Sequence, residues 1–212
     1  MRCKLCLEKD TELITSNKKT YYHCKNCDYI FIDSRYILSQ TEEKACYSNH
    51  QNSIQNRGYV AMFDTFLNKI FSHITKKPGK VLDFGCGPGP VLYQLLIKQG
   101  FHADRYDPYF YDDKKVLQKS YDLIVATEVF EHLSDPLKVF KQLKDITATG
   151  GYIALMTSFH PKDSKKFNSW YYTLDSTHIG FFTDKTFIYL AKELLLKVVY
   201  SDNSKVVLFQ KI

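Results

Sequence analysis

The stretch of sequence that decides the fold is Asp83-Phe84-Gly85-Cys86-Gly87-Pro88-Gly89. An apolar run at residues 79–82 precedes it and VLYQLL follows at residues 91–96, so we predict a turn between a strand and a helix. A carboxylate at the end of a strand can accept hydrogen bonds from a ligand, and successive glycines let the backbone approach that ligand and adopt positive φ. The turn therefore predicts a binding site for a nucleoside cofactor.

The spacing of the glycines indicates which cofactor. A dinucleotide-binding turn reads G-x-G-x-x-G, whereas this turn reads D-x-G-x-G-x-G with a proline between the last two glycines. The order resembles motif I of the class I S-adenosylmethionine-dependent methyltransferases. This resemblance implies that S-adenosylmethionine binds against the turn, where Cys86 contributes its backbone, through Asp83, Gly85, Cys86, Gly87 and Gly89.

Two further segments fall where that family needs them. Residues 101–107 read as a short strand ending in Asp107, the position that holds ribose hydroxyls in doubly wound nucleotide-binding folds. Residues 121–127 form a nearly continuous apolar run, typical of a parallel strand buried on both faces, and EVFEHL follows at residues 128–133. The family similarly carries E-x-x-E-H-L there, and Glu128 is expected to position the cofactor or the helix that precedes the sheet. Each segment alone also fits an ordinary turn, but their order along the chain favours the cofactor site.

The rest of the chain continues the alternation of strands and helices. Pro136 suits the first position of a helix, Thr183 or Asp184 suits an N-cap, and residues 196–201 and 205–210 flank a short turn that predicts an antiparallel pair. The resemblance implies an α/β, doubly wound fold with a seven-stranded, mostly parallel sheet that has an antiparallel C-terminal strand.

The family's third strand is the one clear departure. Residues 112–120 are too short and too basic to carry the acidic motif that recognises adenine in the family. No adenine-binding residue is therefore carried over, and a rudimentary third strand is expected.

Four cysteines form a second motif. Cys3-x-x-Cys6 and Cys24-x-x-Cys27 have seventeen residues between the pairs, which fits the spacing of a four-thiolate zinc site. We predict a zinc ribbon over residues 1–40. Disulfides or redox thiols remain an alternative, although a redox C-x-x-C normally opens a helix in a thioredoxin-like unit and none is visible.

Residues 41–78 are predicted to be a linker and an N-terminal cap helix, and residues 79–212 a Rossmann-like methyltransferase domain. In the zinc-ribbon-bearing methyltransferases that this chain resembles, such a linker folds over the cofactor mouth. Tyr47 and His50 are therefore candidates for contact with cofactor or substrate. The alternative is that polar side chains such as His50 serve local turns and helix starts.

The aromatic segment at residues 159–182 is the candidate substrate region. It leaves the end of a predicted parallel strand, and open parallel sheets bind ligands beyond the carboxyl ends of their strands. Trp170 and Tyr171 are the substrate candidates. The alternative is that the aromatic side chains pack the segment onto the core.

Methyl transfer needs few catalytic groups. The sulfonium is already a good leaving group, so the protein must align the reactants and exclude water, and a base is needed only if the nucleophile carries a proton. His132 and His178 are the candidate bases, because histidine titrates near neutrality. Capping and loop hydrogen bonding are the alternative roles of these two side chains.

Charge and hydropathy argue against RNA and membranes as partners. The formal net charge is +6, yet residues 1–50 carry eight Lys or Arg against seven Asp or Glu, so the predicted ribbon lacks the basic face that RNA phosphates require. The sequence has no apolar run of membrane-spanning length and no secretory signal at its start, which favours a cytoplasmic protein, without membrane partners, that is a monomer or homodimer.

Three functions stay open at this point. The first is a methyltransferase acting on a small molecule, with S-adenosylmethionine and zinc as cofactors. The second is an RNA-base methyltransferase whose ribbon holds the RNA. The third is a noncatalytic cofactor-binding or scaffold protein, since fold and cofactor site do not fix function.

Overall fold

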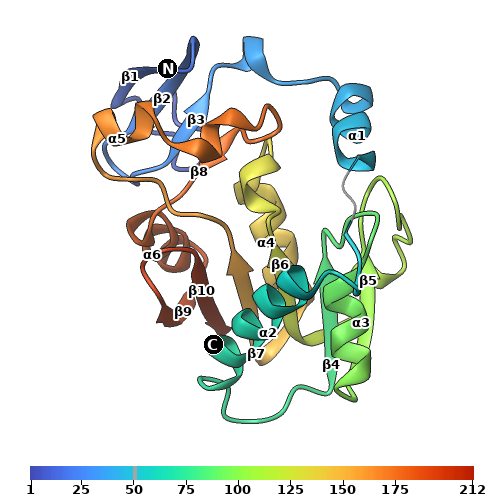
Figure 1. The fold of residues 1–212 in the computed structure, drawn as a ribbon. Coiled ribbons are helices and arrows are strands. Elements are labelled where there is room, and N and C mark those ends of the chain that lie inside the picture. Colours follow the sequence, from blue (N-terminus) through green and yellow to red (C-terminus); the bar gives the residue numbers. More distant parts are fainter. Residues whose placement is uncertain (50–51) are drawn as a thin grey trace.

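The computed structural model describes residues 1–49 and 52–212. Its centre is a six-stranded sheet of order β5-β4-β6-β7-β10-β9 (Figure 1). The four strands β5, β4, β6 and β7 are parallel, and β10 runs antiparallel to both β7 and β9. The strands are β4 (Lys80–Phe84), β5 (His102–Tyr106), β6 (Tyr121–Thr127), β7 (Thr147–Met156), β9 (Leu196–Ser201) and β10 (Val206–Lys211).

The prediction of seven strands was wrong for the described residues. Between β5 and β6 the chain forms an isolated bridge, Asp107 to Tyr111, and a short 3-10 helix, η2 (Val116–Gln118), instead of a strand. Residues 112–120 are few and lysine-rich, with one well-buried side chain, Val116, so they cannot build a strand that packs on both faces. The terminal antiparallel pair, β9 and β10, is confirmed.

Helices cover both faces of the sheet, as in doubly wound folds. On one face α2 (Arg57–Phe71) and α3 (Val91–Lys98) pack against alternate strand residues such as Val81 and Leu123. On the other face α4 (Pro136–Ile146) and α6 (Asp184–Glu193) pack against the residues in between, such as Leu82 and Ile124. The side chain of Thr183 caps α6. This alternation explains why the parallel strands read as continuous apolar runs.

A second sheet lies at the N-terminal end of the molecule. It has the order β1-β2-β3-β8 and is antiparallel throughout. Three of its strands come from the start of the chain, but β8 comes from the aromatic segment, so the two parts of the chain are joined through backbone hydrogen bonds (Figure 1). The strands are β1 (Thr11–Ser16), β2 (Lys19–Cys24), β3 (Ile30–Ile32) and β8 (Gly180–Phe181).

Asp28 connects this N-terminal sheet to the rest of the molecule. Its carboxylate accepts hydrogen bonds from His23 Nε2 at 2.7 Å and Thr183 Oγ1 at 2.8 Å. Its backbone carbonyl lies 2.8 Å from Nε2 of His160. The cysteine-bearing end also shares a hydrophobic core with the large sheet, since Tyr29 packs against Phe182.

Several short elements complete the fold. The helix α1 (Gln40–Ser48) lies apart from both sheets, beyond the end of β5 in Figure 1. The remaining elements are η1 (Ser34–Tyr36), η3 (Phe130–His132), α5 (Ser164–Asn168) and η4 (Tyr171–Leu174). No helix in the described part of the chain is long and apolar enough to cross a membrane.

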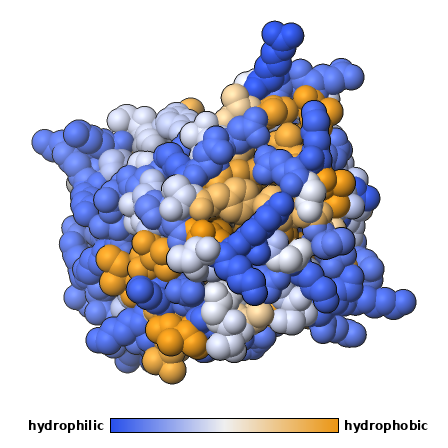
Figure 2. All heavy atoms as spheres, turned by 90° about the horizontal axis from the view of Figure 1, so that it is seen from below, coloured by the Kyte–Doolittle hydropathy of each residue, from blue (hydrophilic) through white to orange (hydrophobic). Residues whose placement is uncertain are grey.

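The lower face in Figure 1 contains the amino ends of the parallel strands. Viewed from that side, hydrophilic side chains dominate and apolar ones are interspersed among them (Figure 2). The cavity described next lies beyond the opposite, carboxyl ends of the strands.

Candidate active site

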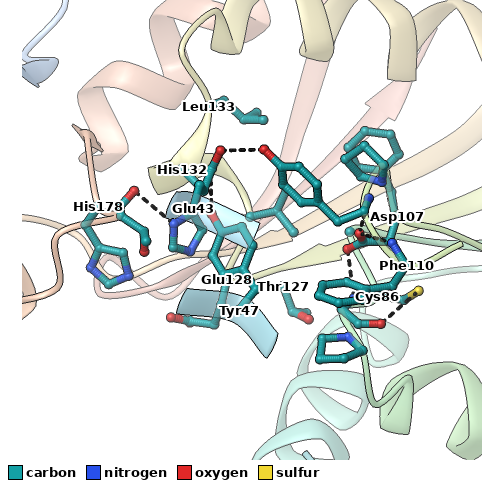
Figure 3. Close-up of a pocket in the computed structure, with 18 of the residues that line it drawn as sticks. Glu43, Tyr47, Cys86, Asp107, Phe110, Thr127, Glu128, His132, Leu133 and His178 are labelled. Atoms are coloured by element: carbon teal, nitrogen blue, oxygen red, sulfur yellow. Dashed lines mark hydrogen bonds between the residues drawn. The ribbon is translucent and has the colours of Figure 1, made fainter. Parts of the chain in front are cut away.

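A cavity of about 1110 Å³ opens beyond the carboxyl ends of β4, β5 and β6. This is where open parallel sheets bind their ligands. Residues predicted to bind cofactor or to act as bases line it together with Tyr47 and Tyr171. Figure 3 shows two groups of side chains in it, one around Cys86, Asp107 and Phe110, and one that includes Tyr47, Glu128, His132 and His178.

Gly85 and Gly87 have different structural reasons for being glycine. Both adopt positive φ, +75° and +65°. A Cβ on Gly85 would lie 2.4 Å from Cγ2 of Val129, whereas a Cβ on Gly87 would meet nothing within 4 Å among the described atoms. Gly85 therefore permits close packing beneath the loop, and Gly87 faces open space in the cavity.

Gly89 has a role that the sequence does not reveal. A Cβ there would lie 2.1 Å from the carbonyl oxygen of Asn52. The missing side chain thus lets Asn52 rest on the glycine loop. Gly89 also lines the cavity, so the same residue forms part of the wall and makes room for Asn52.

Cys86 lines the cavity, but its backbone amide is already engaged. The N–H groups of Gly85 and Cys86 both donate to the carbonyl of Tyr106, at 2.8 and 3.2 Å. These bonds fix the loop to the end of β5. The Cys86 amide is therefore a positioning group for the loop in this structure.

Asp83 is buried beneath the loop, at 2 % exposure. One of its oxygens accepts a hydrogen bond of 3.0 Å from the backbone N–H of Tyr93 in α3. Burial, followed by the negative charge of Asp107, raises the pKa of Asp83 to about 7. Asp83 thus ties the first turn of α3 to the end of β4.

Asp107 stands at the end of β5 with both carboxylate oxygens bonded to backbone. Oδ2 accepts from the N–H of Gly87 at 3.0 Å, and Oδ1 accepts from Tyr109 and Phe110 at 2.8 and 3.2 Å. A carboxylate oxygen can accept more than one hydrogen bond, so Oδ2 retains capacity for a ligand hydroxyl. Asp107 thus organises the loop and lines the cavity at once.

The segment after β6 places two acidic side chains around one tyrosine. The Tyr172 hydroxyl lies 2.9 Å from Oε2 of Glu128 and 2.5 Å from Oε1 of Glu131. Burial, with the charge of Glu131 second, raises the pKa of Glu128 to about 7, and burial also raises the pKa of Glu131. Sequence reasoning assigned no role to Glu131 or Tyr172, although the E-x-x-E spacing was a usable signal for Glu131.

The structure brings the two predicted bases, His132 and His178, together. Their ring centroids are 4.8 Å apart, and the Tyr47 ring lies edge-on to His132 at 5.3 Å. Nδ1 of His132 lies 3.0 Å from the carbonyl of Thr177, and Nδ1 of His178 lies 2.7 Å from that of Tyr172. A carbonyl only accepts, so both Nδ1 atoms carry the proton and both Nε2 atoms carry a lone pair.

Burial keeps these imidazoles neutral. It lowers the pKa of His132, and burial together with the neighbouring His132 lowers the pKa of His178 to about 4. Both rings are therefore uncharged at neutral pH. They are better suited to accept a hydrogen bond or bind an electrophile at Nε2 than to retain a proton.

The helix α1 covers one side of the cavity. Glu43 accepts hydrogen bonds from the hydroxyls of Tyr47 and Tyr109, at 2.7 and 2.6 Å. Since α1 has no buried residue, it is attached through the Glu43–Tyr109 hydrogen bond and through the contacts of the Tyr47 ring with Tyr109 and His132. Glu43 and Tyr109 escaped the sequence reasoning, because their partnership spans sixty-six residues.

The remaining substrate candidates, Tyr171 and Trp170, lie in different surroundings. Tyr171 lines the cavity and is 67 % exposed. Trp170 does not line it and packs instead on Phe167, Tyr172 and Phe181, so the packing alternative holds for this residue. His50 lies outside the described residues.

The four cysteines Cys3, Cys6, Cys24 and Cys27 converge at one end of the N-terminal sheet. Their sulfurs all lie within 4.8 Å of one another, with 3.7 Å between Cys3 and Cys27 and 3.4 Å between Cys6 and Cys24. A disulfide would need about 2.05 Å, and all four thiols are free. Four sulfurs bound to one zinc at about 2.3 Å lie roughly 3.8 Å apart, so the cluster has the spacing of a tetrahedral zinc site.

Comparison with known proteins agrees with this geometry. A profile of the methyltransferase domain matches residues 54–201, more than half of the chain. Among curated proteins, none matches the sequence.

Solved structures with the same fold include several methyltransferases. An O-methyltransferase family protein from Burkholderia thailandensis has a TM-score of 0.50 and 11% identity, covering 84% of this chain and 62% of its own. A putative sarcosine dimethylglycine methyltransferase from Galdieria sulphuraria has a TM-score of 0.51 and 14% identity, covering 72% and 86%. Coclaurine N-methyltransferase bound to N-methylheliamine and SAH has a TM-score of 0.47 and 16% identity, covering 73% and 53%.

This chain thus spans about half to two thirds of the length of two of these structures. The profile match, the parallel-dominated sheet and the glycine loop beside the cavity agree with one another. The chain belongs to the family defined by this methyltransferase domain.

Proposed function

We propose that this protein transfers the methyl group of S-adenosylmethionine to a small-molecule acceptor inside the cavity. The observation that carries the proposal is the division of one cavity into two unlike ends. A glycine loop with Asp107 stands at one end, and a partly buried group of Glu128, His132 and His178 stands at the other.

The cofactor is assigned to the glycine-loop end. The carboxylate of Asp107 is the ligand for the ribose hydroxyls, and the open space beside Gly87 admits the cofactor close to the backbone. The described cavity wall contains acidic side chains but neither Lys nor Arg. A wall of that charge favours a ligand that carries a positive sulfonium.

The acceptor is assigned to the other end, beside Tyr47, His132, His178 and Tyr171. The reaction is in-line: a lone pair of the acceptor forms a bond to the methyl carbon while the carbon–sulfur bond breaks and its electron pair stays on sulfur. Placement under α1 aligns the two reactants and excludes water, which is the main requirement of such a step.

Any proton released by the acceptor is assigned to Glu128. Its pKa of about 7 is matched to proton transfer near neutral pH, whereas the pKa of His178 is lowered to about 4. This differs from the sequence-based expectation that a histidine is the base. His132 and His178 instead offer the lone pairs at Nε2, which can accept a hydrogen bond.

Zinc is assigned to the cysteine cluster, as a structural ion that holds the N-terminal sheet together. Replacing Cys24 with Ala should abolish bound zinc and destabilise this sheet, as measured by elemental analysis and thermal unfolding. Cys46→Ala is the matched control, because Cys46 lies in α1 outside the cluster. Equal zinc content in wild type and the Cys24 variant would exclude the four-cysteine site.

Calorimetric titration of the zinc-replete protein with S-adenosylmethionine, S-adenosylhomocysteine and NAD tests the cofactor assignment. The proposal predicts that both sulfur ligands bind and that NAD does not. Absence of binding by both sulfur ligands would refute the proposed function and favour a noncatalytic protein of this fold.

A further inference from the structure

A cluster of potential metal ligands lies at the acceptor end of the cavity. Donor atoms of Glu131, His132 and His178 all lie within 4.8 Å of one another. Glu131 and His132 are adjacent in the chain, but His178 arrives from the aromatic segment. The fold therefore brings a carboxylate and two imidazoles to one point.

The protonation of the imidazoles suits a cation. Each Nδ1 donates its proton to a backbone carbonyl, which fixes the ring and leaves a lone pair on Nε2. Metal-bound histidines in proteins are almost always held in this way. Within the described residues neither Nε2 forms a hydrogen bond, although His132 Nε2 lies 4.0 Å from Oε1 of Glu131 and His178 Nε2 lies 3.8 Å from Oδ2 of Asp175.

Glu131 supplies the second observation. The residue is 0 % exposed, and its Oε2 has no hydrogen-bond partner in the described structure. A buried polar atom without a partner is costly, and a buried carboxylate more so. Glu128 adds a second, partly buried carboxylate beside it, and no Lys or Arg among the described residues lines the cavity to compensate.

A second histidine cluster in the same molecule shows what a satisfied arrangement looks like. His23, Asp28 and His160 also lie within the spacing of a metal site. There, however, His23 Nε2 is bonded to the Asp28 carboxylate, and both nitrogens of His160 face backbone carbonyls. That cluster uses Nε2 of His23, the Asp28 carboxylate and both ring nitrogens of His160 to join the N-terminal sheet to the large sheet, so these atoms are already engaged with protein partners.

We propose that Glu131, His132 and His178 bind one divalent first-row transition cation, through a carboxylate oxygen of Glu131 and Nε2 of each histidine. Two imidazoles and a carboxylate suit ions such as Mn²⁺, Fe²⁺, Co²⁺ or Zn²⁺. Donors about 2.1 Å from one ion lie at most roughly 4.2 Å apart, so small side-chain rotations close the site.

The proposal extends the proposed function, on which this step rests. A cation at this place would lie beside the cavity, which His132 and His178 line, and it would lower the pKa of an oxygen bound to it. The acceptor class is then a hydroxyl or phenol: its proton leaves to water, the oxygen bonds to the methyl carbon, and the carbon–sulfur bond breaks. Sulfur keeps that electron pair as S-adenosylhomocysteine.

The test uses Mn²⁺ as a paramagnetic probe of the zinc-replete, full-length protein. Thiolates select zinc over Mn²⁺, so the cysteine cluster does not compete for the probe. Electron paramagnetic resonance of free Mn²⁺ during titration should show one tight site per chain. The affinity should fall at least about tenfold in His178→Ala and in Glu131→Gln, which keeps the volume of the side chain.

His23→Gln is the matched control, since it removes an imidazole from the satisfied cluster, and it should bind Mn²⁺ like wild type. Absence of a tight site in the wild-type protein, or equal affinity in all variants, would overturn the proposal. So would loss of Mn²⁺ binding in His23→Gln alone.

S-adenosylhomocysteine binding, measured on the same samples, reports the fold and the proposed function separately. Retained nucleoside binding without a Mn²⁺ site refutes the cation proposal and leaves the methyltransferase assignment standing. A tight Mn²⁺ site without nucleoside binding supports the cation proposal and refutes the proposed cofactor site.

Discussion

The two ends of the cavity are built from different chemical groups. At the cofactor end, a glycine loop, backbone amides and Asp107 form the surface, and they come from one short stretch and the next strand. At the acceptor end, side chains of Glu128, His132, Tyr172 and His178 form it, with the buried Glu131 bonded to Tyr172, and they come from two segments some forty residues apart. A site built from backbone groups can therefore be predicted from local sequence, whereas a site built from side chains of distant segments depends on tertiary packing.

The largest effect should follow from a change beneath the glycine loop. Gly85→Ala adds a Cβ 2.4 Å from Val129 at a residue with φ of +75°. We expect a loss of about 2–5 kcal/mol in unfolding free energy, from backbone strain and overpacking together, and loss of S-adenosylhomocysteine binding. Denaturant unfolding and calorimetry measure the two effects.

Gly87→Ala is the control for that change. It also has positive φ, but open space surrounds the added Cβ, so the cost should be only about 1–2 kcal/mol. Equal destabilisation by the two variants would mean that packing against Val129 does not shape the loop.

The next effect concerns cofactor affinity. Asp107→Ala should weaken S-adenosylhomocysteine binding by about 10- to 100-fold, the worth of hydrogen bonds to a charged group, while the chain stays folded. Asp104→Ala is the matched control, because this β5 carboxylate bonds to Lys119 and Tyr121 and does not line the cavity. Unchanged affinity in Asp107→Ala would remove the ribose role from this residue.

At the acceptor end we expect a mutation to lower stability and to leave cofactor affinity unchanged. Tyr172→Phe removes the hydroxyl between Glu128 and Glu131, so both carboxyl groups lose their shared hydrogen-bond partner. Stability should fall by about 1–3 kcal/mol, while S-adenosylhomocysteine affinity stays within about twofold of wild type. Tyr171→Phe, at the exposed neighbour, should change stability by no more than about 0.5 kcal/mol. A large loss of nucleoside affinity in Tyr172→Phe would mean that the two ends are not independent.

The last prediction is a pH dependence of stability at the cofactor end. The pKa of Asp83 is raised from its ordinary 3.8 to about 7, so the folded state binds the proton more tightly than the unfolded state. The stability that this proton confers is present below about pH 4 and is lost as the pH rises through about 7.

Asp83→Asn keeps an oxygen for the Tyr93 amide and removes the charge. Thermal unfolding between roughly pH 5 and pH 8 should therefore show a gain of the variant over wild type that grows with pH. A constant difference would exclude a neutral Asp83 in the folded protein.

The same contrast explains what sequence could and could not predict. The turn at Asp83, the strand ending in Asp107 and the helix starts at Pro136 and Thr183 were readable, because each rests on local chemistry. The cysteine spacing also predicted a convergence that the fold confirms.

Other features needed the folded chain. The large sheet has six strands instead of the predicted seven, because residues 112–120 form no strand. Their short, basic sequence indicated this, but the seven-strand prediction followed the family pattern. Gly89 packs under Asn52, Glu43 joins two tyrosines, and Trp170 packs away from the cavity. Each depends on segments that are distant in sequence, so no local pattern could have shown it.

A crystal structure of the protein with S-adenosylhomocysteine would test the two-ended arrangement. The account predicts that the ribose hydroxyls lie within hydrogen-bond distance of Asp107 and that the sulfur points towards Glu128 and the His132–His178 pair. A nucleoside with its ribose away from Asp107, or with its sulfur directed away from the acceptor end, would contradict it.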